Sequence, residues 1–212
     1  MVKVGIFGGT FNPPHVGHLR LAEEVASFHG LSRIVFIPCF IPPHKRSQGT
    51  ARPEERLEMI RRSCADNPVF EVSDMEISFQ GLSYTVNTLD VFAKKRDLEP
   101  HFILGTDSLR EIHTWKDYER LFSLAHFIVV RRPGGDFQSA WAQVPDILRK
   151  GFRDRGDHLL HSSSKRLIPS NVEGLNVSST MIRSLVGAGR SIRYLVTESV
   201  RQYIMERNLY RN

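Results

Sequence analysis

The chain has little cysteine and no long apolar run, and each absence excludes some classes of protein. Its two cysteines, Cys39 and Cys64, cannot build a disulfide framework, and there is no CxxC pair to hold zinc. Apolar runs such as Phe127 to Val130 have the length of a strand and fall far short of the ~18 residues that span a bilayer. The apolar stretch from Val2 to Phe7 is too short for a secretory signal. We therefore expect a cytoplasmic protein with no membrane partner.

Acidic residues are fewer than basic residues. The 212 residues include 29 Lys and Arg against 23 Asp and Glu, which gives a net charge of +6. This balance favours anionic partners such as nucleotide phosphates. The basic residues are spread along the chain and are not interleaved with aromatic residues, so we expect no nucleic-acid partner. The length suits a single domain over residues 1–212.

Short apolar runs alternate with helical patterns along most of the chain. The runs at residues 2–7, 33–37, 69–72, 101–104 and 127–130 predict buried strands. Helical spacing of apolar residues follows, as at Val16, Leu19, Ala22 and Val25, and again at Leu57, Val86 and Leu121. The alternation predicts an α/β fold, a Rossmann-like doubly wound parallel sheet with helices on both faces.

The two parts of the C-terminal third differ in how clearly they can be interpreted. Residues 134–174 mix Ser, Arg, Gly and Asp around one expected helix near Trp141 to Leu148, and we expect an excursion there rather than a second domain. Residues 178–207 carry two apolar stripes at helical spacing, separated by Gly187-Ala188-Gly189. They predict a helical segment at the C-terminus.

The loop after the first predicted strand carries the strongest chemical signal. Residues 5–18 read Gly-Ile-Phe-Gly-Gly-Thr-Phe-Asn-Pro-Pro-His-Val-Gly-His, and a helix is predicted to begin near Val16. Glycines allow backbone N–H groups to approach a phosphate, and a helix N-terminus favours anions. His15 and His18 share one face of that helix start, and each can donate to phosphate oxygens. The pattern predicts a phosphate-binding loop for a nucleotide.

The spacing excludes other nucleotide and metal motifs. The segment is neither GxGxxG, nor the P-loop pattern, nor HExxH. Residues 8–18 instead resemble the signature of the HxGH nucleotidyltransferases, and Val177-Ser178-Ser179-Thr180-Met181-Ile182-Arg183 is similar to a second motif of that superfamily, ISSTxIR. Within the superfamily the chain most resembles the bacterial nicotinate-mononucleotide adenylyltransferases. This resemblance covers nearly the whole chain except residues 134–174.

The resemblance implies a reaction and its partners. ATP and nicotinate mononucleotide would give nicotinate adenine dinucleotide and pyrophosphate, in NAD biosynthesis, by in-line attack of the mononucleotide phosphate on the α-phosphorus. We expect Mg²⁺ to arrive with ATP and to keep several of its waters. We expect no metal site made by the protein, because no third ligand is placed by spacing beside His15 and His18.

The resemblance also assigns residues. It implies catalytic roles for His15, His18, Lys45 and Arg183. It implies that ATP is bound by Gly8, Gly9, Thr10, Phe11, Gly105, Asp107, Ser178, Ser179 and Thr180. It implies that the acceptor is bound by Asn12, His44, Tyr84, Thr85 and Trp115, with the indole stacked on the pyridine ring and backbone amides near Thr85 taking its carboxylate.

Three alternatives remain. Pantetheine-phosphate adenylyltransferases are shorter and typically have Thr in place of the first histidine of HxGH, so His15 and Trp115 argue against that family. A cytidylyltransferase of the same superfamily would fit HxGH but not the Pro42-Pro43-His44-Lys45 loop. A non-catalytic nucleotide sensor or RNA-binding protein on the same fold is compatible with the charge, although both motifs are intact.

Overall fold

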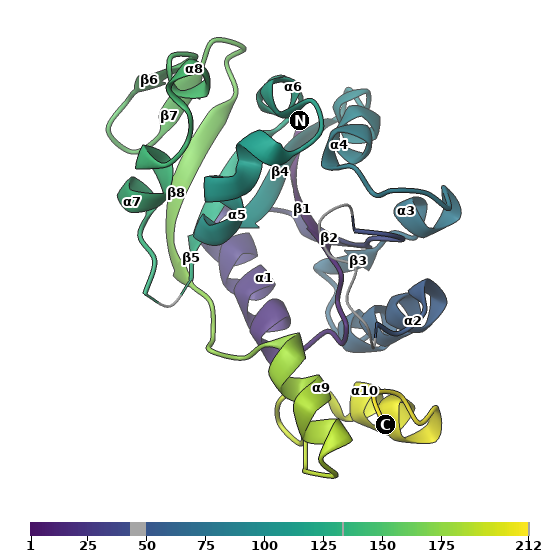
Figure 1. Ribbon diagram of the computed structural model, residues 1–212. Helices are drawn as coiled ribbons and strands as arrows, with labels where there is room; N and C mark the ends of the chain where they lie inside the picture. The colour runs from purple at the N-terminus through teal and green to yellow at the C-terminus, as the bar shows by residue number, and fades with distance from the viewer. Residues whose placement is uncertain (43–49, 133, 212) are drawn as a thin grey trace.

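A computed structural model of the protein describes residues 1–42, 50–132 and 134–211. Its strands form an eight-stranded sheet in the order β3-β2-β1-β4-β5-β8-β7-β6 (Figure 1). The first six strands of this order are parallel to their neighbours, whereas β6, β7 and β8 are joined by antiparallel pairing. The prediction of a mostly parallel, doubly wound sheet is confirmed.

The five predicted strands are all present, and several are longer than expected. They are β1 (Val2–Gly9), β2 (Arg33–Pro38), β3 (Phe70–Val72), β4 (Leu98–Gly105) and β5 (His126–Arg131). The middle strands are apolar on both faces because helices cover both sides. Ile34 and Phe36 of β2 belong to one core cluster, and Val35 and Ile37 belong to the other, as the two-residue period of a strand requires.

The helices separate into two layers. Helices α1 (Val16–His29) and α2 (Pro53–Cys64) pack on one face. The helices on the opposite face are α4 (Thr85–Ala93), α5 (Thr106–Glu111) and α6 (Tyr118–Leu124), and Figure 1 shows α4, α5 and α6 together on that side. Two short elements complete this part of the chain, α3 (Met75–Ser78) and the 3-10 turn η1 (Ile112–Thr114).

The segment 134–174 contains more regular structure than we expected. Its elements are α7 (Phe137–Ala142), α8 (Asp146–Arg149), β6 (Phe152–Asp154), β7 (Leu159–His161) and β8 (Arg166–Glu173). The single helix expected near Trp141 to Leu148 is wrong, because Pro145 disfavours the α conformation of Val144 and separates α7 from α8. Strand β8 pairs in parallel with β5 and extends the main sheet.

The C-terminal segment forms α9 (Ser179–Gly187) and α10 (Glu198–Glu206), drawn in yellow-green and yellow in Figure 1. These helices share a third core cluster with α2, in which Met59, Ile182, Val186, Val200 and Ile204 are buried. The segment therefore rests on α2, close to the carboxyl ends of the strands. The single-domain organisation stays a prediction. Across the described residues, every helix is too short or too polar to cross a bilayer.

Candidate functional site

The predicted site residues gather at one edge of the sheet, where parallel strands end. Strand β1 ends at Gly9, β4 at Gly105 and β5 at Arg131. The strand ends are neighbours across the ladder, since Gly9 pairs with Pro38, the last residue of β2, and Gly105 pairs with Val130 of β5. Ligands of open parallel sheets bind beyond this edge. The fold therefore contains the sheet edge at which the site was predicted to lie.

The turn after β1 is shaped by a buried aromatic ring. Phe11 is 2% exposed and packs edge-on against Phe7, with ring centroids 5.7 Å apart. Its φ of +49° is unusual for a bulky residue, and a Cβ on Gly9 would lie 3.0 Å from its ring. Glycine at position 9 thus allows the ring to fold back beneath the strand end. The Phe11 side chain belongs to the core, so a nucleotide would meet the backbone of this loop.

The two motif histidines stack on each other at the start of α1. Their ring centroids are 3.6 Å apart and the planes are inclined by 25°. The His15 backbone N–H donates to His18 Nδ1 at 3.2 Å, so neutral His18 carries its proton on Nε2. His15 Nδ1 is buried and has no hydrogen-bond partner among the residues that the structure describes. One ring thus presents a donor, and the other has unused hydrogen-bonding capacity.

Both rings are neutral at pH 7 in the ligand-free protein. Burial, and then the charge of Arg132, lower the pKa of His15 from 6.5 to about 4. Burial, followed by the charges of His15 and Arg132, lowers the pKa of His18 well below 6.5. The ligand-free structure favours donation by a neutral Nε2–H of His18, with protonation promoted only when an anion is close.

Direct hydrogen bonds join the two motifs, although they lie at opposite ends of the chain. Ser179 Oγ donates to the Pro13 carbonyl at 2.8 Å, across 166 positions of sequence. Arg183 Nη1 donates to the Asn12 carbonyl at 2.8 Å, and its Nη2 donates to Thr180 Oγ1 at 3.3 Å. Ser178 is the N-cap of α9, where its Oγ accepts from the Met181 N–H at 3.1 Å. The N-terminus of α9 and the loop after β1 therefore lie side by side and form one surface, and a helix N-terminus favours anions.

The ends of β4 and β5 add a carboxylate and a guanidinium. Asp107 lies in the first turn of α5, and its side chain is 59% exposed. Arg132 Nε lies 3.6 Å from Asp107 Oδ1. A Cβ on Gly105 would collide with Asp107 Oδ1 and would lie 3.0 Å from Arg132 Nε, so glycine leaves room for both groups above the strand end. An exposed carboxylate at this edge can accept hydrogen bonds from ribose hydroxyls.

Aromatic residues predicted for the acceptor lie on the α4 side of this edge. Tyr84 is the N-cap of α4 and Thr85 is its first residue. Lys116 Nζ lies 4.7 Å from the centre of the Tyr84 ring, which brings the residue after Trp115 onto this helix start. The half-buried Trp115 ring meets Phe102 edge-on at 6.1 Å. The structure thus groups Tyr84, Thr85 and Trp115, whereas the predicted His44 and Lys45 lie outside the described residues.

Asn12 and two residues that we did not predict form a support behind the loop. The Asn12 side chain is 3% exposed, and its Oδ1 accepts from the Ala51 N–H and from the Tyr210 hydroxyl. Arg56 is 1% exposed and donates to backbone carbonyls around the site. The sequence contained a signal for Arg56, because it lies four residues before Ile60 and is therefore a charged residue on the apolar face of α2. Tyr210 had no such signal.

A group of three residues with metal-ligand atoms lies away from this edge. Side-chain ligand atoms of Glu99, His101 and His126 all fall within 4.8 Å of one another. However, His126 Nδ1 accepts from the Arg166 backbone N–H at 3.1 Å, so its neutral ring carries the proton on Nε2, which lies 3.4 Å from Glu99 Oε1. A metal ion would require the lone pair of that same nitrogen. The arrangement is better described as a buried polar cluster than as a metal centre.

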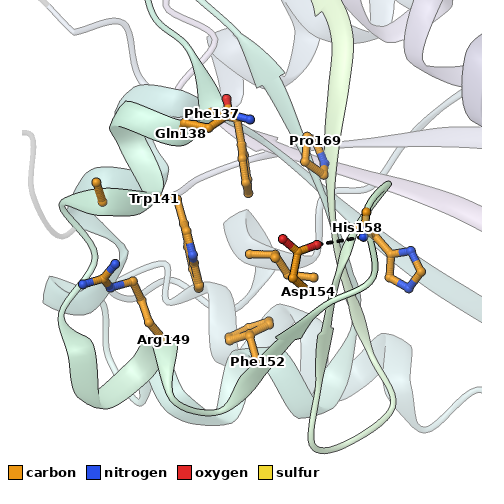
Figure 2. Close-up of a pocket in the computed structure, with 11 residues that line it drawn as sticks. Phe137, Gln138, Trp141, Arg149, Phe152, Asp154, His158 and Pro169 are labelled. Carbon is orange, nitrogen blue, oxygen red and sulfur yellow. Dashed lines mark hydrogen bonds between the residues drawn. The ribbon is translucent and has the colours of Figure 1, made fainter.

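A separate cavity of about 350 Å³ lies between α7, α8 and the β6–β7 hairpin (Figure 2). Its lining includes Phe137, Trp141, Phe152 and Pro169. In Figure 2 the Phe137 and Trp141 rings stand side by side, and their planes differ by 9°. None of the residues predicted for nucleotide binding lies in the described lining, so this cavity is not part of the site.

Comparisons with known proteins agree with this geometry. A family model described as cytidylyltransferase-like matches residues 6–185. Two similar bacterial relatives are both named "Probable nicotinate-nucleotide adenylyltransferase". The relative from Desulfatibacillum aliphaticivorans is 43% identical over 99% of this chain and 100% of its own length. The relative from Syntrophotalea carbinolica is 44% identical over 100% of this chain and 98% of its own length.

Solved structures show the same fold at lower identity. The nicotinic acid mononucleotide adenylyltransferase of Plasmodium falciparum, complexed with APC, superimposes with a TM-score of 0.73 at 18% identity, covering 99% of this chain and 98% of that one. The same enzyme complexed with NaAD gives a TM-score of 0.74. The fold and the paired motifs define a nucleotidyltransferase of the cytidylyltransferase-like class. Within that class, the chain belongs to the family of nicotinate-nucleotide adenylyltransferases.

Proposed function

We propose that the protein transfers the adenylyl group of ATP to nicotinate mononucleotide, forming nicotinate adenine dinucleotide and pyrophosphate. One observation carries the proposal more than any other: Ser179 and Arg183 of the C-terminal motif bond directly to the Pro13 and Asn12 carbonyls of the glycine-rich loop. The resulting surface offers hydroxyls, a guanidinium and imidazoles to a triphosphate. The names of full-length relatives at 43% and 44% identity support the same reaction.

The mechanism follows from the donors that surround the phosphates. A phosphate oxygen of the mononucleotide forms a bond to the α-phosphorus of ATP, while the bond from that phosphorus to the bridging oxygen of pyrophosphate breaks. Negative charge on the equatorial and leaving oxygens must be stabilised as this happens. The Nε2–H of His18 is a fixed donor for that charge, because the His15 N–H occupies its Nδ1. His15 adds a second ring at stacking distance.

The remaining ATP contacts are assigned by position. Ser179 and Arg183 bond to the loop after β1. The exposed residues Ser178 and Thr180 lie beside them at the start of α9, and we assign the four residues to the β- and γ-phosphates. Gly8, Gly9 and Thr10 provide backbone amides at the end of β1. Gly105 and Asp107 suit the adenosine ribose. Lys45 remains a proposed phosphate contact on the strength of the family motif.

The divalent ion is proposed to be Mg²⁺ that arrives on the ATP phosphates. The described side chains of the phosphate surface are imidazoles, hydroxyls and a guanidinium, and none of them is a carboxylate, the side-chain ligand that proteins most often use for Mg²⁺. Such a site leaves the ion to phosphate oxygens and water. The ion would neutralise charge on the triphosphate during transfer.

Recognition of the pyridine ring is assigned to the start of α4. We infer that Trp115 stacks on the ring and that amides near Thr85 bind its carboxylate, with Tyr84 beside them. The cation of Lys116 over the Tyr84 ring adds positive potential there and favours the acid over the amide. A cytoplasmic location stays a prediction.

The test is pyrophosphate release from ATP and Mg²⁺ with nicotinate mononucleotide, nicotinamide mononucleotide or phosphopantetheine as acceptor. We expect turnover with nicotinate mononucleotide and much less with the other two. Release with phosphopantetheine alone would overturn the assignment of Trp115 and Thr85 while keeping adenylyl transfer. Folded protein that binds ATP but releases no pyrophosphate with any acceptor would refute the enzymatic function.

A further inference from the structure

Asn12, whose carbonyl joins the loop after β1 to α9, is itself held by hydrogen bonds to its side chain. The Asn12 carbonyl accepts from Arg183, and the next carbonyl, that of Pro13, accepts from Ser179. The position of this short stretch therefore sets where α9 presents its donors. The side chain of Asn12 has separate partners, since its Oδ1 accepts from the Ala51 N–H at 3.0 Å and from the Tyr210 hydroxyl at 2.7 Å.

Tyr210 reaches this point from the C-terminal end of the described chain, 198 positions after Asn12 in sequence. Its φ is +63°, a conformation that a bulky residue adopts only when its surroundings hold it there. The ring packs against the cluster formed by α2, α9 and α10. Burial raises the pKa of the Tyr210 hydroxyl, so the group stays protonated and remains a donor near neutral pH.

Arg56 holds the second donor to Asn12 in place. Its Nε donates to the Ala51 carbonyl at 3.1 Å, so both the N–H and the C=O of Ala51 are engaged. The same guanidinium donates to the Thr10 carbonyl at 2.9 Å and to the carbonyls of Cys39 and Phe40 at 2.7 and 2.9 Å. It thus connects the loops after β1 and β2 with the start of α2. Charged donors to buried carbonyls are strong bonds, and an unmade bond here is expensive.

We propose that Tyr210 and Arg56 are positioning residues that fix the phosphate loop through Asn12, without touching substrate themselves. This inference rests on the proposed adenylyl transfer for its kinetic readout, and on ATP binding for a readout independent of the acceptor. Tyr210 controls the Asn12 side chain directly, and Arg56 controls it through Ala51. A shift of Asn12 moves the carbonyl that orients Arg183 and hence the contacts of the triphosphate.

The first experiment compares Tyr210→Phe with Tyr194→Phe. Tyr194 is 89% exposed, so it provides the same chemical change without a buried bond. We expect Tyr210→Phe to lower kcat/KM for ATP by about 3- to 10-fold, the equivalent of one neutral hydrogen bond. ATP affinity measured by calorimetry should fall in the same direction. KM for nicotinate mononucleotide should stay within about twofold of the wild type, because the acceptor residues at α4 are not connected to Tyr210.

The second experiment compares Arg56→Lys with Arg61→Lys on the same helix. Arg61 lies at the surface, where it pairs with Asp74. Lysine keeps the charge at position 56 but cannot serve four carbonyls with the geometry of a guanidinium. We expect a loss of about 30-fold or more in kcat/KM for ATP for Arg56→Lys, and none for Arg61→Lys. Kinetic constants are expressed per folded molecule, with circular dichroism and ATP titration giving the folded fraction.

The outcomes separate the inference from the function on which it rests. If Tyr210→Phe matches the wild type in both ATP affinity and kcat/KM, the proposal is wrong. It is also wrong if activity falls only in proportion to the folded fraction, or if KM for both substrates rises equally. If wild-type protein releases no pyrophosphate, the function fails, yet the ratio of ATP affinities for Tyr210→Phe and Tyr194→Phe still decides the positioning role. An Arg56→Lys protein that does not fold leaves that decision to Tyr210→Phe.

Discussion

Two pairs of stacked histidines occupy different ends of the same sheet, and their surroundings differ. His15 and His18 lie beyond the carboxyl end of β1, with ring centroids 3.6 Å apart. His101 and His126 lie on β4 and β5, with centroids 4.8 Å apart. Burial is the largest cause that lowers the pKa in both pairs, to about 4 for His15 and about 3 for His126. Residue type, stacking and burial are therefore shared.

The pairs differ in how their ring nitrogens are used. His101 Nδ1 bonds with the Glu99 carbonyl, His126 Nδ1 accepts from the Arg166 N–H, and the Nε2 atoms of both rings approach the Glu99 carboxylate. In the other pair, His15 Nδ1 is buried without a partner among the described residues, and His18 has only its Nδ1 engaged. A buried polar group left unpaired in a folded protein calls for an explanation, and a bound ligand, ion or water is one. Partner accounting thus separates a site from a structural cluster better than residue type does.

The largest effect should come from removing the donor in the first pair. His18→Ala is expected to lower kcat by about 10³-fold with little change in the circular dichroism spectrum, because the Nε2–H is proposed to act on charge that develops in the transition state. Steady-state pyrophosphate release measures it. The matched change in the second pair, His101→Ala, should leave kcat within about twofold. Equal losses in both variants would remove the functional distinction between the pairs.

Acid should destabilise the ligand-free protein through both pairs. Their folded-state pKa values lie below the unfolded value of 6.5, so between about pH 6.5 and pH 4 the unfolded chain binds more protons and stability falls as pH falls. His15 and His126 together should lower the free energy of unfolding by about 4 kcal/mol between pH 7 and pH 5. Urea unfolding at the two pH values checks this.

Adding ATP should separate the contributions of the two histidine pairs to the pH dependence of stability. A triphosphate beside His15 and His18 raises their pKa values, so with ATP bound the dependence on pH should become shallower. The contribution of His101 and His126 should not change, because nothing in the proposed ATP site touches them. A pH dependence identical with and without ATP would place the nucleotide away from the first pair.

Breaking the second pair should reduce stability and spare activity. His126→Ala removes the acceptor of the Arg166 N–H and leaves a cavity beside Glu99, which should lower the free energy of unfolding by about 2–3 kcal/mol at pH 7. The folded fraction should keep its wild-type KM for ATP. Thermal unfolding and kinetics on the same sample measure both quantities. A raised KM for ATP in His126→Ala would indicate that the two ends of the sheet are coupled in a way that the hydrogen bonds do not show.

The strands that the sequence predicted depend on short-range apolar patterns, whereas the strand that it did not predict depends on pairing with a distant part of the chain. Strands β1, β2, β4 and β5 are apolar runs covered by helices on both sides, so periodicity identifies them. Strand β8 was missed because Pro169, Ser170 and Asn171 interrupt its apolar pattern, although the backbone still pairs with β5. Its place in the sheet depends on a neighbour about forty residues away, which no window of sequence contains.

The same difference applies within the site. The resemblance predicted His15, His18, Ser179 and Arg183, and the structure brings them together through the Pro13 and Asn12 carbonyls. It did not predict that the Phe11 ring would turn into the core, nor that Tyr210 would support Asn12. Those roles depend on backbone conformation and long-range packing. Motifs therefore identify groups that meet a ligand more readily than groups that hold them.

The smallest predicted effect concerns a group that has both roles. Ser178 Oγ accepts from the Met181 N–H as the N-cap of α9, and Ser178 is an exposed residue at the helix start that is proposed to bind the phosphates. Ser178→Ala should lower the free energy of unfolding by about 1 kcal/mol, as for other N-caps. It should also raise KM for ATP by about 3- to 10-fold, because the lost hydroxyl could donate to a phosphate while accepting from Met181. Ser178→Thr keeps the cap and the hydroxyl and serves as the control. A loss of stability with an unchanged KM would assign Ser178 to the structural class, together with His101 and His126.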